Sequence, residues 1–389
     1  MHGTLAPVLG TNWSALALVP KLIGRRRSFV SRLLAGQQRR VDAQLCRPGQ
    51  LPAHGIYRVL VCRPNHRLGN TLLLSPLLRE LETLYPGAEI DIISAGEAAV
   101  ALYSSRFQVR KIASFYRHAA KHLLHTIRQL RAMRAHTYDL AIDASMDSNS
   151  GRLLLGLARA RYKLGFAHDA APDKALAALA SNCPEHHGKR IVHLLRTAYA
   201  GDCASSWPTL NLDLSIEEMR KGAKALQRIT GELSMSKDSR PVIGIFANAT
   251  GKKCYPESWW TAFVTQLRVR RPDLRIVNVL AQHGNSQLPQ VPAGYFTSNL
   301  RHLGAVLANL DGFISADCGV MHLAVATGIP TLGLFTADNI DKYAPFGGNN
   351  AALKTQSSGL DPVFFEQAAG WLDKALPVHS DAERVVNHA

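Results

Sequence analysis

The chain of 389 residues is too long for one ordinary hydrophobic core and suits two domains of roughly 150–200 residues each. Its formal net charge of +16 at pH 7 indicates an anionic partner. Its six cysteines are scattered, with no C-x-x-C pair, which argues against a zinc site or disulfide framework and for a reducing compartment. Because no run of ~18 apolar residues could span a membrane and the N-terminus lacks the order of a secretion signal, we expect a cytoplasmic protein.

Residues 1–55 are predicted to form a basic N-terminal appendage. Residues 1–50 hold eight lysines and arginines against one acid, Asp42, which gives +7 of the total charge. Apolar residues at roughly helical spacing, from Leu16 to Leu34, flank Arg25-Arg26-Arg27, as in helices that lie on an anionic membrane. Peripheral contact with the inner face of the cytoplasmic membrane and a solvated tail both stay open. A nucleic-acid-binding arm is disfavoured because no nucleic-acid fold follows.

The N-terminal domain, expected over residues 56–234, alternates strands and helices. Strands are predicted at 58–62, 90–93 and 138–143, and helices at 71–84 and about 119–134. Pro76 is awkward inside the first helix: either Ser75 and Pro76 begin the main helix, or the first turn kinks there. The alternation predicts a parallel sheet covered by helices, with functional residues in loops beyond the carboxyl ends of its strands.

The C-terminal domain is expected over residues 235–389, after a polar stretch at 232–240 that we interpret as the linker. Strands are predicted at 241–246 and 275–281. The loop after the first of them, 247–253, contains Lys252 and Lys253, and Gln282 begins the loop after the second. A final helix at 362–376 is expected to pack back across the first domain.

The stretch from Asp311 to Thr336 is predicted to be a strand (312–315), a tight turn (316–319), a short helix (320–327) and a strand (331–335). The turn at Asp317-Cys318-Gly319 lies where the unpaired N–H groups of a helix start favour a phosphate. Gly319 would let the backbone approach a ligand, and Asp317 could cap the turn or accept a hydrogen bond from a sugar hydroxyl. His322 points towards the same end, although an ordinary core histidine is the alternative.

Two motifs resemble those of a known family. DCGVMHLAVATGIPTLGLF is similar to the donor-binding signature of glycosyltransferase family 9, the bacterial heptosyltransferases, and RPNHRLGNTLLLSPLLRELETLYPGAEIDII is similar to its N-terminal motif. The order of motifs matches from about residue 57 to 347. The resemblance implies an α/β protein of the GT-B fold, in which two Rossmann-like lobes with parallel sheets face a central cleft. The donor would bind to the second lobe and the acceptor to the first.

The resemblance also implies a donor site. In the family a lysine at the position of Lys253 faces the donor phosphates, and a polar group near Gln282 holds the ribose. Cys318 stands where the family has serine or threonine. The expected donor-binding residues are Asn248, Lys253, Gln282, Asp317, Cys318, Gly319 and His322.

The catalytic base is the point at which the chain departs from the family. The family's aspartate after the glycine of the N-terminal motif is here Asn70, which cannot take a proton but is a strong helix cap for a helix starting at Thr71. His66 in the same loop, or Asp143 or Asp147 beyond the next strand, could be the base instead. The reaction could also run with little base assistance, or the protein could bind a donor without transferring it.

The implied reaction is sugar transfer with inversion. No D-x-D pair follows a strand, so we expect a helix start and Lys253, without a metal or other cofactor, to neutralise the leaving diphosphate. The implied partners are a nucleotide-sugar donor, ADP-heptose, and an acceptor that is a lipopolysaccharide core or similar lipid-linked glycan. A nucleotide-sugar epimerase on the same fold and a non-enzymatic nucleotide-sugar-binding scaffold are the alternatives.

Overall fold

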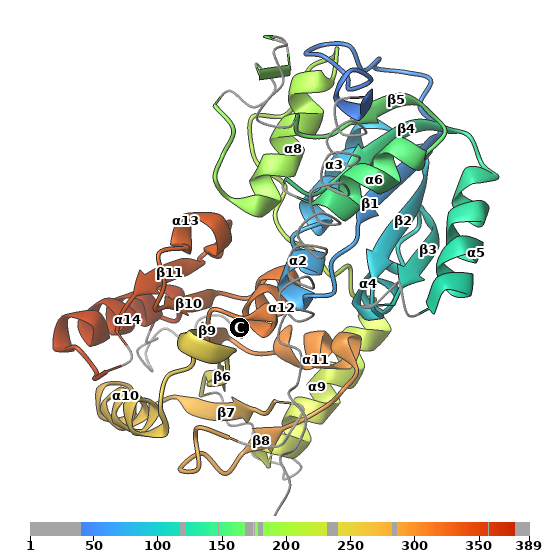
Figure 1. Ribbon diagram of the computed structural model, residues 1–389. Coiled ribbons are helices and arrows are strands. Elements are labelled where there is room, and N and C mark those ends of the chain that lie inside the picture. Colours follow the sequence, from blue (N-terminus) through green and yellow to red (C-terminus); the bar gives the residue numbers. More distant parts are fainter. Residues whose placement is uncertain are drawn as a thin grey trace, which may run out of the picture.

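Two α/β lobes, one above the other in Figure 1, make up the protein. The computed structural model describes residues 40–116, 122–146, 148–167, 174, 176–177, 182–231, 240–281, 286–356 and 358–377. Part of the expected appendage (residues 1–39), Asp147, Gln282 and the expected linker at 232–239 lie outside these ranges.

The first lobe is a parallel five-stranded sheet in the order β3-β2-β1-β4-β5, covered by helices. Its strands are β1 (Arg58–Arg63), β2 (Glu89–Ala95), β3 (Val109–Phe115), β4 (Tyr138–Asp143) and β5 (Ala160–Leu164). Its helices are α2 (Leu68–Leu72), α3 (Ser75–Leu84), α4 (Ala98–Tyr103), α5 (Leu123–Arg134), α6 (Asn149–Leu157) and α8 (His187–Ala198).

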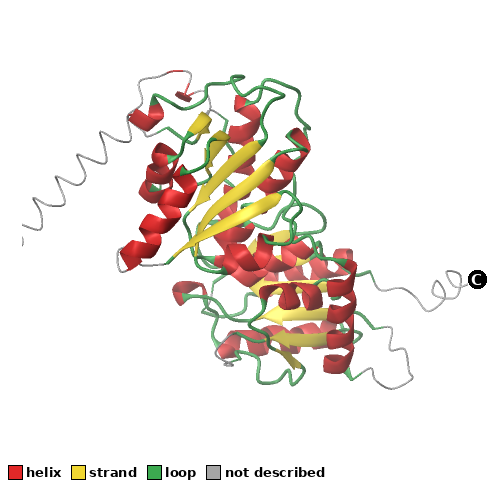
Figure 2. Ribbon diagram, turned by 90° about the vertical axis from the view of Figure 1, so that its right-hand side faces the viewer, coloured by secondary structure: helices red, strands yellow, loops and turns green. Residues whose placement is uncertain are grey.

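The second lobe is a parallel six-stranded sheet in the order β11-β10-β9-β6-β7-β8. Its strands are β6 (Val242–Phe246), β7 (Arg275–Val279), β8 (Gly294–Tyr295), β9 (Gly312–Ala316), β10 (Thr331–Phe335) and β11 (Ala351–Lys354). Its helices are the single 3-10 turn η2 (Gly251–Lys253), α10 (Glu257–Arg270), α11 (Leu300–Leu307), α12 (Gly319–Thr327), α13 (Ile340–Tyr343) and α14 (Pro362–Ala375). Figure 2 shows the two sheets with helices on their faces.

Both sheets reverse their strand order at one place. In the first sheet β1 lies between β2 and β4, and in the second β6 lies between β7 and β9. At such a point the chain leaves neighbouring strands towards opposite faces of the sheet, and a crevice opens beyond their carboxyl ends. The loops after β1, β6 and β9 are therefore the places where a ligand is expected.

Residues 40–55 belong to the first lobe and not to an appendage. Val41, Leu45 and Leu51 are buried in its core, and Leu45 and Leu51 form single β-bridges with Lys163 and Tyr199. The chain folds onto the lobe here because these apolar side chains gain more from burial than from solvation.

The helix expected over residues 71–84 is divided into two. The short helix α2 ends at Leu72, and α3 starts at Ser75 with Pro76 in its first turn. Proline lacks an N–H and fits best at a helix start, so of the two alternatives the new start at Ser75 and Pro76 is the one observed. Asn70 is consequently not a cap: α2 begins at Leu68, and Asn70 is its third residue.

The final helix does not cross to the first lobe. Phe364 and Phe365 of α14 are buried against the aromatic side chains of α10, including Trp259 and Phe263, in the core of the second lobe. The expectation that this helix packs back across the first domain is therefore wrong for the described residues.

Helix α9 (Ile216–Thr230) precedes the boundary expected between residues 234 and 235 but lies along α11 (Figure 1). Gly222 marks the crossing, since a methyl group added there would overlap the carbonyl oxygen of Ala305. Because α9 packs on the second lobe, we propose that this lobe begins near Ser215.

Gly222→Ala should lower the free energy of unfolding by about 1–3 kcal/mol, because overpacking at a backbone contact forces α9 and α11 apart. Gly370→Ala is the matched control: it lies inside α14, where an added methyl group meets nothing within 4 Å. That control should be neutral or stabilising by up to ~1 kcal/mol, as alanine is the better helix former. Thermal unfolding of the three proteins measures both effects, and a Gly222→Ala protein as stable as wild type would contradict the close crossing.

Candidate active site

A cleft of about 760 Å³ lies where the two lobes meet. The first lobe contributes the loop after β1 and the start of α2, and the second contributes the loops after β6, β7 and β9 together with α13. Its lining residues are His66, Arg67, Leu68, Gly69, Asn70, Phe246, Asn248, Ala249, Thr250, Lys253, Ala281, Asp317, Cys318, Gly319, Val320, His322 and Tyr343. The cleft thus occupies the point of strand-order reversal in both sheets.

Two glycines let the lobes approach at the cleft. A Cβ atom on Gly69 would lie 2.8 Å from Cδ2 of His322, and one on Gly319 would lie 2.8 Å from Cβ of Leu68. Both distances are shorter than real carbon contacts, so any other residue would push α2 away from α12. Close backbone approach is the reason for glycine at both positions.

Lys253 is held in place by Asp317. Its Nζ lies 2.5 Å from Oδ2 of Asp317, and Nδ2 of Asn339 donates a hydrogen bond of 2.8 Å to the same oxygen. Asp317 is buried, whereas the Lys253 side chain is 36% exposed and reaches the cleft. The ring of Tyr343 lies 5.6 Å from the Lys253 Nζ and also contacts His187 of the first lobe. An ammonium group held this way can bind an anion without moving first.

The start of α12 carries no side-chain cap. Cys318 occupies the cap position without a side-chain cap hydrogen bond; its Sγ, a weak acceptor, faces the Val320 and Met321 N–H groups and lies 3.4 Å from Oγ of Ser315. Burial raises the pKa of the Cys318 thiol, which therefore stays neutral. The first N–H groups of a nine-residue helix thus lack a capping side chain at the edge of the cleft, an arrangement that suits a phosphate.

His322 lines the cleft as a neutral imidazole. Its pKa is lowered to about 4, mainly by burial; Asp317 opposes this shift, and Lys253 and His187 add to it. At neutral pH the ring can donate or accept a hydrogen bond but carries no charge. Among the described residues, the positive charge that faces the cleft comes from Lys253, from the exposed Arg67 and from the start of α12.

The candidate bases differ in whether they line the cleft. His66 is exposed and Asn70 half-buried, and both line the cleft. Asp143 is buried in the first lobe, where its Oδ1 accepts a hydrogen bond of 3.0 Å from the Ser145 N–H. Gly151 has no side chain that would overlap the Asp143 carboxylate. Burial raises the pKa of Asp143 to about 7 against the opposing effect of Arg152. Asp143 is not among the residues that line the cleft.

Four polar residues of the site were not predicted from the sequence: Arg67, Thr250, Asn339 and Tyr343. Asn339 and Tyr343 follow β10, the strand beside β9, so their place beyond a carboxyl strand end was the available signal. Within the described residues there is no group of three or more histidines, cysteines or acids that could hold a metal ion. Nor is any helix in those ranges long and apolar enough to cross a membrane.

Comparisons with known proteins agree with this architecture. The family model for glycosyltransferase family 9 (heptosyltransferase) matches residues 126–361. Lipopolysaccharide heptosyltransferase 3 of Escherichia coli is 23% identical over 314 residues, which are 72% of this chain and 84% of that protein.

Solved structures show the same fold. A family 9 glycosyltransferase from Veillonella parvula superposes with a TM-score of 0.64 at 16% identity, covering 82% of this chain and 97% of the other. The E. coli heptosyltransferase WaaC with ADP superposes with a TM-score of 0.61 at 18% identity, covering 82% and 99%.

Two parallel-sheet lobes around a cleft at their facing strand ends make up the GT-B fold. Since the family model covers more than half of its length, the chain belongs to glycosyltransferase family 9.

Proposed function

We propose that this protein transfers heptose from ADP-heptose to a lipopolysaccharide core or a similar lipid-linked glycan, with inversion and without a metal ion. The observation that carries the proposal is that Lys253 and the uncapped start of α12 share one cleft with the His66–Asn70 loop. The E. coli relative is a lipopolysaccharide heptosyltransferase, and relatives of the same fold are known with ADP and with ADP-2-deoxy-2-fluoro heptose.

The second lobe would hold the donor. Lys253 and the first N–H groups of α12 would bind the diphosphate and neutralise the charge that develops as it leaves, which is the task a metal ion performs in other transferases. Asp317 would act by holding the Lys253 ammonium group. Asn248, Cys318 and His322 line the same cleft and are assigned to donor binding, and Gln282 stays a prediction.

The first lobe would present the acceptor. An acceptor hydroxyl oxygen forms the new bond to the anomeric carbon, the bond from that carbon to the diphosphate oxygen breaks, and the diphosphate leaves with the electron pair. The hydroxyl proton must go to a base. We propose His66, because it is exposed in the cleft whereas Asp143 is buried outside it. Asn70 would orient the acceptor by hydrogen bonding.

Lys253→Ala should weaken binding of ADP about ten- to hundred-fold, because a charge-assisted hydrogen bond to phosphate is worth about 1.5–3 kcal/mol. Lys252→Ala is the matched control, since the neighbouring Lys252 is exposed and does not line the cleft. Isothermal titration calorimetry measures both affinities. Equal affinity of the two variants for ADP would place the diphosphate elsewhere.

His66→Ala should lower kcat by about 10²–10⁴-fold, the usual contribution of a general base. Asn70→Asp should change kcat only a few-fold in the otherwise native protein, but in the His66→Ala background it supplies a carboxylate in the same loop and should restore part of the rate.

The control for this series is His54→Ala, an exposed histidine of the first lobe outside the cleft. Turnover is measured against pH after circular dichroism has shown that each variant is folded. If neither His66→Ala nor the double variant differs from wild type by more than a few-fold, base catalysis from this loop is excluded.

We also propose that the basic segment before residue 40 contacts anionic membrane, where a lipid-linked acceptor would be found. A protein lacking residues 1–39 retains Val41, Leu45 and Leu51 of the first-lobe core, so it should fold. It should lose salt-sensitive binding to phosphatidylglycerol vesicles in sedimentation assays and keep activity on a short soluble acceptor. Undiminished vesicle binding after the deletion would refute the proposed contact.

A further inference from the structure

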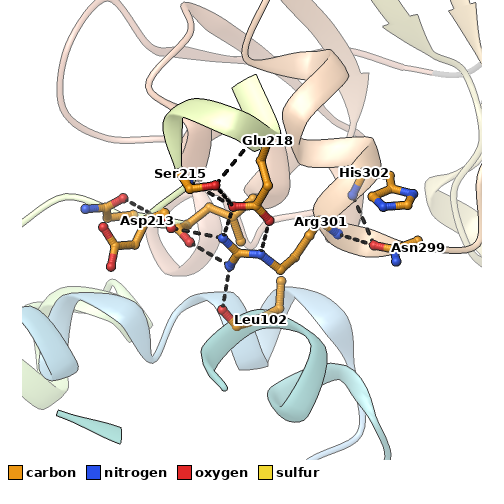
Figure 3. Close-up of polar contacts among 9 residues, drawn as sticks. Leu102, Asp213, Ser215, Glu218, Asn299, Arg301 and His302 are labelled. Carbon is orange, nitrogen blue, oxygen red and sulfur yellow. Dashed lines mark hydrogen bonds and ion pairs between the residues drawn. The ribbon is translucent and has the colours of Figure 1, made fainter. Parts of the chain in front are cut away.

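Arg301, in the first turn of α11, uses every N–H donor of its guanidinium group (Figure 3). Its Nε and Nη2 donate to the Glu218 carboxylate at 2.5 and 2.7 Å. Its Nη1 donates to the carbonyl oxygens of Leu102 and Leu212 at 3.3 and 3.2 Å, and Nη2 also donates to that of Asp213 at 3.0 Å. One side chain thereby bonds to three separate segments.

These segments belong to different parts of the molecule. Leu102 lies in α4 of the first lobe, and Glu218 lies in α9, which packs along α11 of the second. Leu212 and Asp213 lie in the connection between the lobes. Arg301 therefore joins the first lobe, the connection and the second lobe at one point.

The connection is fixed on both sides of this point. The Asn211 N–H donates to Oγ of Ser75 in the first lobe at 3.2 Å, and the Leu212 N–H donates to the carbonyl oxygen of Ala326 in α12 at 2.8 Å. Asp213 has a φ of 54°, in the left-handed region that side chains rarely adopt, and its N–H donates to Oδ1 of Asn211 at 2.7 Å. The direction of the chain between the lobes is thus set by specific bonds.

Glu218 has two roles. Its Oε2 accepts hydrogen bonds from the N–H and Oγ of Ser215, which completes the capping box at the start of α9, and both of its oxygens accept from Arg301. Hydrogen bonding from Arg301 lowers the pKa of this carboxyl to about 2. The pair is mostly shielded from solvent, so it is a stronger contact than an ordinary surface ion pair.

We propose that Arg301 is a positioning residue that sets the angle between the lobes and so brings the donor site on α12 and Lys253 to the His66–Asn70 loop. This inference rests on the proposed function. Arg301 does not line the active-site cleft, so any effect on transfer must act through the arrangement of the lobes. The planar fork of arginine suits this role because it fixes several acceptors at defined directions, which a lysine cannot do.

The test compares two charge-removing substitutions with a matched control. Arg301→Gln removes the guanidinium group. Glu218→Gln removes the negative charge of the carboxylate, while glutamine can still complete the capping box at the start of α9. The control is Arg270→Gln, which removes an arginine–carboxylate pair between Arg270 of α10 and Asp373 of α14. Figure 1 shows both helices on the side of the second lobe away from α9.

Both test variants should lower kcat by about 10–100-fold, because a misplacement of ~1 Å between reacting groups can cost about 10²-fold in rate. Their affinity for ADP, measured by calorimetry, should stay within about twofold of wild type, since the donor contacts lie in one lobe. Small-angle X-ray scattering should show a larger radius of gyration for both. Arg270→Gln should match wild type in all three measurements, and Arg301→Lys should recover only part of the rate.

A folded Arg301→Gln protein with wild-type kcat would overturn the proposal. An equal loss of ADP affinity and kcat would also overturn it, because the damage would then lie within the second lobe. If Arg301→Gln does not fold, the other two variants decide: wild-type kcat in both Glu218→Gln and Arg301→Lys would also overturn the proposal. If the wild-type protein transfers no sugar, the proposed function is wrong, but the role of Arg301 can still be tested. In that case a radius of gyration equal to wild type in every variant would refute the role of Arg301.

Discussion

The backbone of α2 passes so close to the start of α12 that neither Gly69 nor Gly319 has room for a side chain. This contact joins two loops that each lie at the strand reversal of their own sheet. Without it, the loop after β1 and the loops after β6 and β9 would border two separate surfaces. With it, they enclose one cleft, and chemistry that needs a donor on one lobe and an acceptor on the other becomes geometrically possible.

The charges around this contact are few and are fixed in place. Asp317 is buried and holds both Lys253 and Asn339, so the Lys253 ammonium group is oriented before any ligand arrives. His322 is buried beside it as a neutral imidazole, and Cys318 is a half-buried neutral thiol. In the described residues, the groups of the cleft that could bind an anion are therefore Lys253, the exposed Arg67 and backbone N–H groups. A backbone contribution does not require a particular side chain, which explains how Cys318 can replace the hydroxyl residue of related sequences.

Strands were the most predictable part of the fold. Tyr138–Asp143 and Thr331–Phe335 have the predicted bounds, because buried parallel strands are short apolar runs that end at turn residues. Predicted site residues on both lobes also meet in the cleft, because the carboxyl ends of the predicted strands determine where their loops lie. Which way a side chain points after a strand was not predictable: Asp143 ends β4 but turns into the protein. Arg301 left no signal at all, because three of its acceptors are backbone carbonyls that any residue could provide.

The described residues of the first lobe run from 40 to at least Tyr199, and we place α9 and the residues after it in the second lobe. The chain then crosses between the lobes once within the described ranges. In other words, the two sheets are consecutive rather than interleaved along the chain. During synthesis, which proceeds from the N-terminus, the ribosome has made the whole first sheet before β6 emerges. The first lobe can therefore fold before the second is complete. Until α12 follows, the surface of α2 around Gly69 is exposed. Because residues of both lobes line the cleft, it cannot form until the chain has been made as far as Tyr343.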